Sequence, residues 1–313
     1  MVRSLRRLGV LMVFGCLHGL LFEGDILMLY AELGVLLLLL HRLPTKWLLS
    51  LGLLLMLSFP LGHLLGGDRG DDWPADNATE ASAWLEEDRM ESPLAVGSFS
   101  EVLAYHAEFL PERFWADWQY PDSGFLVLAC FLVGFCLIRS GWGTLARLTP
   151  AQAIRIALGL WVLGLSLMAI ERYWAATAGY APFERSNAAP MQVLGGDLVY
   201  LVATLSLTAA WFVSVWCWAQ SQRLVGLRGL IASAGQMSLT GYVSQTLIFT
   251  TVFYGYGWGA AFIWGPAQVA AFAVVVYALQ VVLCYVWLQR FRRGPLEWLW
   301  RCLTYSRWEP MRR

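Results

Sequence analysis

The sequence RRLGVLMVFGCLHGLLFEGDILMLYAE, residues 6–32, decides how this chain is organised. Two arginines open an apolar segment that carries His18, an acidic turn runs from Glu23 to Asp25, and a second apolar segment carries Glu32. Two apolar segments around a short acidic turn predict a membrane hairpin whose basic end is cytoplasmic, because cytoplasmic loops are enriched in Lys and Arg. We expect the rest of the chain to form further hairpins packed around this one.

The composition of the 313-residue chain is that of an integral membrane protein. Hydrophobic residues make up 58% of the chain, charged residues 14%, and the mean hydropathy is +0.55. A soluble domain carries about 25% charged residues, so the bilayer is the expected partner. The net charge is zero, which gives no indication of a nucleic-acid partner. The six cysteines and four histidines show no metal-ligand spacing, and we expect neither a metal nor a bound cofactor.

Apolar segments of bilayer width predict an all-α, polytopic transmembrane helix bundle of about eight spans. A helix rises 1.5 Å per residue, so roughly 20 residues cross a hydrocarbon core of about 30 Å. The expected spans are residues 5–22, 26–40, 47–65, 124–138, 156–170, 198–219, 238–256 and 267–288. Gly15 and Gly19 share one face of the first span and allow another backbone to approach closely.

The segments between the spans differ in charge. Residues 66–122 are acidic and predict an extracytoplasmic loop with short amphipathic helices, one over 77–91 and one after the capping-box pattern Ser98–Glu101. Residues 289–313 form a basic tail, in which Pro295 opens a helix and Glu297 can pair with Arg301. Most of the 22 Lys and Arg residues fall on the same side of the predicted bundle as this tail. This distribution predicts a multi-pass protein of the bacterial inner membrane with both termini in the cytoplasm.

His18 and Glu32 are the first candidates for chemistry. They lie at similar depths in the two helices of the predicted hairpin, and ionisable side chains within a membrane are costly enough to indicate function. One interpretation is a His–carboxylate pair facing an outward cavity, with His18 as a general base. The alternative is a polar contact between packed helices, or a Glu32 that stays neutral.

Four further side chains are candidates for substrate binding. Asp25 and Asp197 each follow glycine at the expected outer start of a span, where they could cap the helix or face a substrate. Tyr242 and Gln245 belong to a polar stripe on the expected span 238–256, which also includes Ser238 and Gly241. That stripe could line a pathway or hold helices together by hydrogen bonds.

Several runs of the sequence resemble one known family. They are Arg6–Leu11, Phe14–His18, Gly24–Leu27 and Tyr30–Gly34 near the N-terminus, and Gly235–Gln245, Phe253–Gly257 and Phe291–Tyr305 in the C-terminal third. In these runs the chain resembles the bacterial "domain of unknown function 418" (YeiB-like) family of multi-pass membrane proteins. Two residues depart from the family pattern, because Gly241 stands where asparagine is frequent and Glu32 where an apolar residue is usual.

The resemblance implies a fold distantly similar to membrane acyltransferases, which move acyl groups onto sugars or lipid-linked acceptors. Those enzymes carry a catalytic histidine in early spans, and the family pattern begins with one or two spans that have no counterpart here. The resemblance therefore does not assign a role to His18, which is an independent hypothesis from the residues.

Three functions are compatible with these observations. The first is transfer of an acyl group, with acyl-CoA as a possible donor, to an extracytoplasmic or lipid-linked acceptor with His18 as the base. The second is transport of a small amphiphilic solute, with Glu32, Asp25 and Asp197 as proton-linked carboxylates. The third is a non-catalytic component that binds a partner through the acidic loop.

Overall fold

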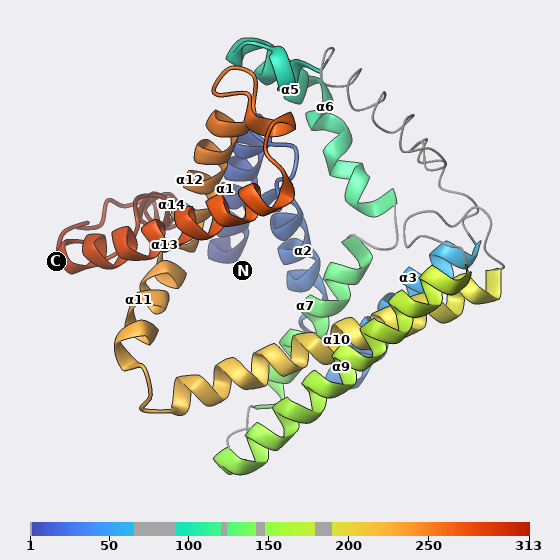
Figure 1. The fold of residues 1–313 in the computed structure, drawn as a ribbon. Coiled ribbons are helices and arrows are strands. Elements are labelled where there is room, and N and C mark those ends of the chain that lie inside the picture. Colours follow the sequence, from blue (N-terminus) through green and yellow to red (C-terminus); the bar gives the residue numbers. More distant parts are fainter. Residues whose placement is uncertain (1, 66–91, 120–123, 142–147, 179–189) are drawn as a thin grey trace. The chain divides into compact units, whose positions relative to one another are not determined.

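The computed structural model describes residues 2–65, 92–119, 124–141, 148–178 and 190–313, and these residues are helical apart from short turns (Figure 1). The helices are α1 (Val2–Gly19), α2 (Leu27–Leu40), α3 (Thr45–Leu65), α5 (Pro93–Val96), α6 (Phe99–Gln119), α7 (Gly124–Arg139), α9 (Pro150–Ala178), α10 (Pro190–Gln220), α11 (Val225–Gln236), α12 (Ser238–Phe253), the 3₁₀ turn η1 (Ala260–Phe262), α13 (Pro266–Arg290) and α14 (Pro295–Tyr305). The all-α prediction is confirmed for this part of the chain. The surface helix expected at 77–91 lies outside it.

Fewer helices could span a membrane than the eight expected. Among the described residues, α3, α9, α10 and α13 are long and apolar enough, and a fifth span results if α6 and α7 are counted as one broken helix. The expected spans 26–40, 124–138 and 238–256 correspond to α2, α7 and α12, which have only 14, 16 and 16 residues. At 1.5 Å per residue these reach roughly 21–24 Å, less than the hydrocarbon core. The first helix has 18 residues but contains three arginines.

The chain divides into two compact units. One consists of Met1–Leu39, Asp76–Ala116 and Leu224–Arg313, and the other of Leu40–Ala75 and Asp117–Arg223. In the second unit, α9 and α10 lie side by side along their length (Figure 1). A Cβ added to Gly164 would lie 2.7 Å from Leu207, and one added to Gly195 would lie 2.7 Å from Trp174. Glycine at these two positions therefore permits the close approach of the helices.

Helix boundaries in this second unit correct one sequence prediction. The span expected at 198–219 is part of α10, whose described length begins at Pro190. Asp197 therefore lies two turns inside the helix and is buried, so it is not an N-cap. The apolar run at 198–219 forms most of α10. The residues before it extend the helix toward its N-terminus, because nothing between Pro190 and Asp197 stops it.

In the first unit, α1 and α2 form the predicted hairpin. A Cβ on Gly15 would lie 2.6 Å from the backbone nitrogen of Met28, and Gly34 lies directly against Leu8. The close approach expected at Gly15 is therefore present, with the first turn of α2 as its partner. It brings the end of α1 against the start of α2.

The C-terminal tail packs on the start of α1 and on α12. The guanidinium of Arg7 lies 4.5 Å from the centre of the Trp300 ring, whose indole N–H donates to the Arg7 carbonyl. A helix does begin at Pro295, as expected. The predicted pairing of Glu297 with Arg301 is wrong, because Arg301 Nε lies 2.6 Å from Glu309. The Glu297 carboxylate instead accepts two hydrogen bonds from Thr240 at the start of α12.

Candidate functional site: a buried aspartate, histidine and threonine

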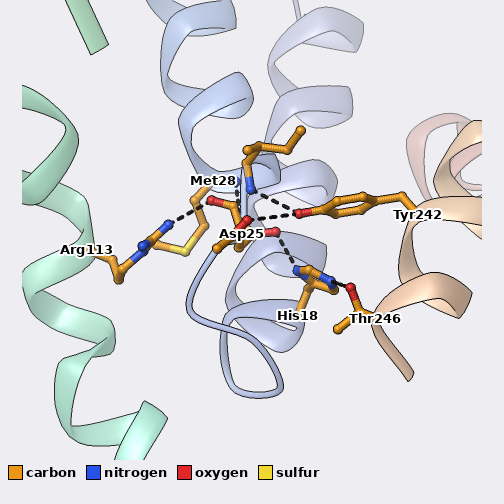
Figure 2. A network of polar contacts seen from close by, with 8 residues as sticks. His18, Asp25, Met28, Arg113, Tyr242 and Thr246 are labelled. Atoms are coloured by element: carbon orange, nitrogen blue, oxygen red, sulfur yellow. Dashed lines mark hydrogen bonds and ion pairs between the residues drawn. The ribbon is translucent and has the colours of Figure 1, made fainter. Parts of the chain in front are cut away.

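The candidate site lies in the first unit, where the end of α1 meets the α1–α2 turn and the middle of α12. His18 occupies the last turn of α1, with its Nδ1 2.8 Å from Asp25 Oδ1 and its Nε2 2.8 Å from Thr246 Oγ1 (Figure 2). His18 and Asp25 are each 2% exposed, and Thr246 is 7% exposed. We call these three side chains the buried relay.

The geometry of the buried relay favours one tautomer of the imidazole. An ionised carboxylate only accepts hydrogen bonds, so Asp25 takes its bond from the Nδ1–H of His18. A neutral ring then presents the Nε2 lone pair to the hydroxyl of Thr246, which can donate to it. Carboxylate, imidazole and hydroxyl in this order form the arrangement by which hydrolases and transferases activate a hydroxyl group.

Asp25 holds the turn as well as the imidazole. Its Oδ2 accepts a hydrogen bond of 2.9 Å from the backbone N–H of Met28 in the first turn of α2. Its backbone carbonyl accepts a 2.8 Å hydrogen bond from Arg113 on α6 (Figure 2). The capping contact predicted for Asp25 is thus present. One carboxylate therefore caps α2 and also bonds the ring of His18.

Tyr242 covers the imidazole and binds the turn from α12. The centres of the Tyr242 and His18 rings are 4.6 Å apart. The phenol hydroxyl donates to the carbonyl of Gly24 and accepts from the N–H of Ile26, both at 3.3 Å. Tyr242 and Thr246 are four residues apart and therefore share one face of α12, which places both beside His18.

Gln245 lies on another side of α12, so the polar stripe seen in the sequence is divided. Its side-chain amide donates to Gln280 of α13 at 2.7 Å. The amide of Gln280 donates in turn to the Gly241 carbonyl and to Ser244. This network holds α12 against α13. Gln245 therefore helps to hold two helices together by hydrogen bonds, which is one of the two roles considered for the stripe from the sequence.

The carboxylate predicted to pair with His18 is the wrong one. Both ring nitrogens of His18 are occupied by Asp25 and Thr246, and Glu32 is half-buried farther along α2. The predicted pairing of His18 with Glu32 assumed that both segments of the hairpin are straight helices. The chain between Gly19 and Leu27 instead turns back over the end of α1, which brings the Asp25 carboxylate onto the ring. Asp197 belongs to the other unit of the chain.

Three residues around the turn were not candidates from the sequence, namely Thr246, Arg113 and His106. Thr246 follows Gln245 directly, and its spacing of four from Tyr242 was the available signal. Arg113 and His106 lie seven residues apart on one face of α6. Arg113 bonds the backbone carbonyl of Asp25, and His106 bonds that of Leu20. The Nδ1 of His106 is 3.2 Å from the Leu20 carbonyl oxygen, while its buried Nε2 has no hydrogen-bond partner among the described residues.

The described residues bring together no group of three His, Cys, Asp or Glu side chains that could hold a metal ion. The polar side chains at the candidate site are those of the buried relay and its neighbours. Among these neighbours, Arg113 and Tyr242 bind backbone atoms of the turn. Asp25, His18 and Thr246 are the side chains that contact one another in series.

Comparisons with known proteins identify the family. The model of the family described as "Protein of unknown function (DUF418)" matches residues 167–307. The uncharacterized protein YeiB of Escherichia coli strain K12 is 30% identical over 328 residues, which covers 95% of this chain and 74% of that protein. The chain belongs to the DUF418 family. This confirms the resemblance found in the sequence, and Tyr242 and Thr246 fall inside the DUF418 match, whereas His18 and Asp25 precede it.

A second relative matches over a similar length. The uncharacterized protein YxaH of Bacillus subtilis strain 168 is 27% identical over 321 residues, covering 98% of this chain and 72% of that protein. An uncharacterized 39.9 kDa protein from the amylase 3′ region of Bacillus acidopullulyticus is 30% identical over 91 residues, 26% of this chain and 23% of that protein. No solved structure matches the chain.

Proposed function

We propose that this DUF418 protein is a membrane acyltransferase in which His18 acts as general base. The observation that carries the proposal is the imidazole held between a buried carboxylate and a buried hydroxyl, with 2.8 Å on either side. A carboxylate on Nδ1 keeps the Nε2 lone pair directed at the hydroxyl and stabilises the imidazolium that forms when Nε2 takes the proton. A positioned base of this kind accelerates proton transfer by about 10²–10⁴-fold.

Acyl transfer suits this arrangement because its central step is attack by a hydroxyl on an acyl carbonyl. A hydroxyl is a weak nucleophile at neutral pH and needs a base within hydrogen-bond reach. We propose an acyl thioester such as acyl-CoA as donor and a hydroxyl of an extracytoplasmic or lipid-linked molecule as acceptor. The implied kinship with membrane acyltransferases supports this choice of chemistry over hydrolysis.

The protein acts, in this proposal, in the bacterial inner membrane with both termini in the cytoplasm. The apolar helices α3, α9, α10 and α13 support a membrane location. The exposed charged side chains of the C-terminal tail support the orientation, since Arg292, Arg293, Arg307, Arg312 and Arg313 are all cationic. The tail, residues 289–313, contains seven arginines and two glutamates, so it keeps a net positive charge.

Transport of a small amphiphile is the alternative function. A transporter could use the Asp25–His18 pair as a proton carrier. Such a role requires the pair but not the hydroxyl on Nε2. The conservative variant Thr246→Val should therefore spare proton-coupled transport, and assays of acylation and of amphiphile movement distinguish the two functions.

The proposal is tested by comparing the envelope lipids and glycans of a deletion strain with those of the parent. We expect at least one acylated species to be missing from the deletion strain and restored by the wild-type gene. Its unacylated precursor should accumulate to a similar extent. Unchanged acylation, together with altered uptake or export of a labelled amphiphile, would contradict acyl transfer and favour transport.

A further inference from the structure

The hydroxyl of Thr246 is bonded differently from several other hydroxyls inside the described helices. A serine or threonine within a helix commonly donates to the carbonyl four residues earlier. That bond is present for Ser206, Thr208, Ser214, Ser233, Thr251 and Thr304, at 2.6–2.8 Å. Thr246 is in the middle of α12, yet its hydrogen bond goes to His18 on α1. Its hydroxyl is thus directed at a base.

The surroundings of Thr246 hold this bond in place. The threonine side chain is buried and β-branched, so few rotamers are open to it within a helix. One turn earlier, Tyr242 packs on the face of the imidazole and fixes the turn that carries Asp25. Preorganised groups of this kind keep a nucleophile and its base aligned before the substrate arrives.

We propose that Thr246 is the nucleophile of this acyltransferase and carries the acyl group as a covalent ester. This inference rests on the proposed function and adds an intermediate to it. The transfer then consists of two half-reactions, so donor and acceptor need not be bound at the same time. His18 serves as the proton carrier in both, with Asp25 as its positioning residue.

The half-reactions balance without any further reactant. In the first, Thr246 Oγ1 attacks the carbonyl carbon of the acyl thioester while His18 Nε2 takes the hydroxyl proton. The C–S bond breaks, and the proton passes from His18 to the sulfur, which leaves as a thiol. In the second, the acceptor hydroxyl gives its proton to His18 and attacks the ester. The bond from the acyl carbon to Thr246 Oγ1 breaks, and that oxygen regains a proton from His18.

The chain offers a matched set of variants for the test. Thr246→Val keeps the shape of the side chain and removes the hydroxyl, whereas Thr246→Ser keeps the hydroxyl. Thr251→Val is the control, because Thr251 lies on the same helix and its hydroxyl donates to the Leu247 carbonyl at 2.6 Å. Each full-length variant is purified in detergent, and only variants that elute as the wild type does and match its circular dichroism are compared.

Two probes are applied to each protein. Acetyl-CoA without acceptor tests formation of the ester, and a fluorophosphonate tests activation of the hydroxyl independently of the donor. Peptide mass spectrometry should locate both adducts on residue 246 in the wild type, Thr246→Ser and Thr251→Val. Neither adduct should form in Thr246→Val, and His18→Ala should slow fluorophosphonate labelling by at least about a hundredfold.

The outcomes separate this inference from the proposed function. If Thr246→Val restores the acylated envelope species and neither probe labels residue 246, the covalent intermediate is refuted while acyl transfer stands. If residue 246 is labelled but deletion of the gene leaves every acylated species unchanged, Thr246 is shown to be a nucleophile, and its assignment to acyl transfer fails. Absence of labelling by both probes in the folded wild-type protein contradicts the inference.

Discussion

Replacing Asp25 with asparagine is the sharpest perturbation of the buried relay, because it changes one atom and almost no volume. In the wild type, Oδ1 faces His18 Nδ1 and Oδ2 accepts from Met28 N–H. Asparagine has one acceptor oxygen and one NH₂ group. If the oxygen keeps the bond to Met28, the NH₂ group faces Nδ1, and the imidazole must carry its proton on Nε2 instead. Nε2 then donates to Thr246 and no longer accepts its proton.

The magnitude of this effect follows from the two hydrogen bonds that Asp25 makes, to His18 and to Met28. In the serine-protease triad, the same aspartate-to-asparagine substitution stabilises the wrong tautomer and lowers kcat about 10⁴-fold. We expect the rate of the reaction at Thr246 to fall by about 10³–10⁴-fold here. If the oxygen turns to His18 instead, the buried Met28 N–H loses its acceptor, at a cost of about 1–3 kcal/mol in the free energy of unfolding. Either orientation therefore leaves a measurable defect.

Both defects are measured on the same protein. The rate of fluorophosphonate labelling at Thr246 reports the tautomer, and chemical unfolding in detergent reports the lost hydrogen bond. Asp25→Glu is the companion variant, since it keeps the charge but displaces the carboxylate by one methylene group. Labelling of Asp25→Asn at the wild-type rate with wild-type stability would refute the reasoning, because it would show that neither bond of Asp25 matters.

Two further predictions concern packing and pH. Gly15→Ala places a Cβ 2.6 Å from the Met28 nitrogen, so we expect it to lower the free energy of unfolding by about 1–3 kcal/mol. Gly9→Ala meets no atom within 4 Å and should raise the free energy of unfolding by about 0.5–1 kcal/mol in the same assay, because alanine favours a helix interior more than glycine does. The hydrogen bond from Arg301 lowers the pKa of Glu309 from its ordinary value of 4.5. The pairing of Glu309 with Arg301 therefore stabilises the tail fully above pH 4.5, and this stabilisation is lost as the pH falls through the lowered pKa of Glu309. Hydrogen exchange of the tail amides should rise relative to the rest of the chain on acidification in the wild type, and Glu309→Gln should abolish this dependence.

The sequence predicted the class of the protein and half of the candidate site. Apolar runs identify α3 and α13 as membrane-type helices because composition over about 20 residues is enough for that inference. Composition does not determine helix ends, which explains why α12 ends three residues earlier than expected and α10 begins eight residues earlier. The number of spans was overestimated because apolar runs as short as those at 26–40 and 124–138 were counted as full spans.

The candidate site shows the same division between local and long-range information. His18 and Asp25 were candidates because polar side chains in an apolar hairpin stand out in the sequence. Their pairing was missed because the fold of the turn decides which carboxylate reaches the ring. Thr246 is 228 residues from His18 in the sequence, and a single threonine on an apolar helix gives no sign of a partner at that separation. Only the packing of α12 against the hairpin brings them together.

The most direct test of the central claim is the envelope profile of the deletion strain carrying His18→Ala at normal expression. His41→Ala is the matched control, since His41 lies in the other unit of the chain. Our account predicts that His18→Ala leaves the acylated species missing, as in the deletion strain, while His41→Ala restores it to the parental level. Full restoration by His18→Ala would contradict a catalytic role for the imidazole.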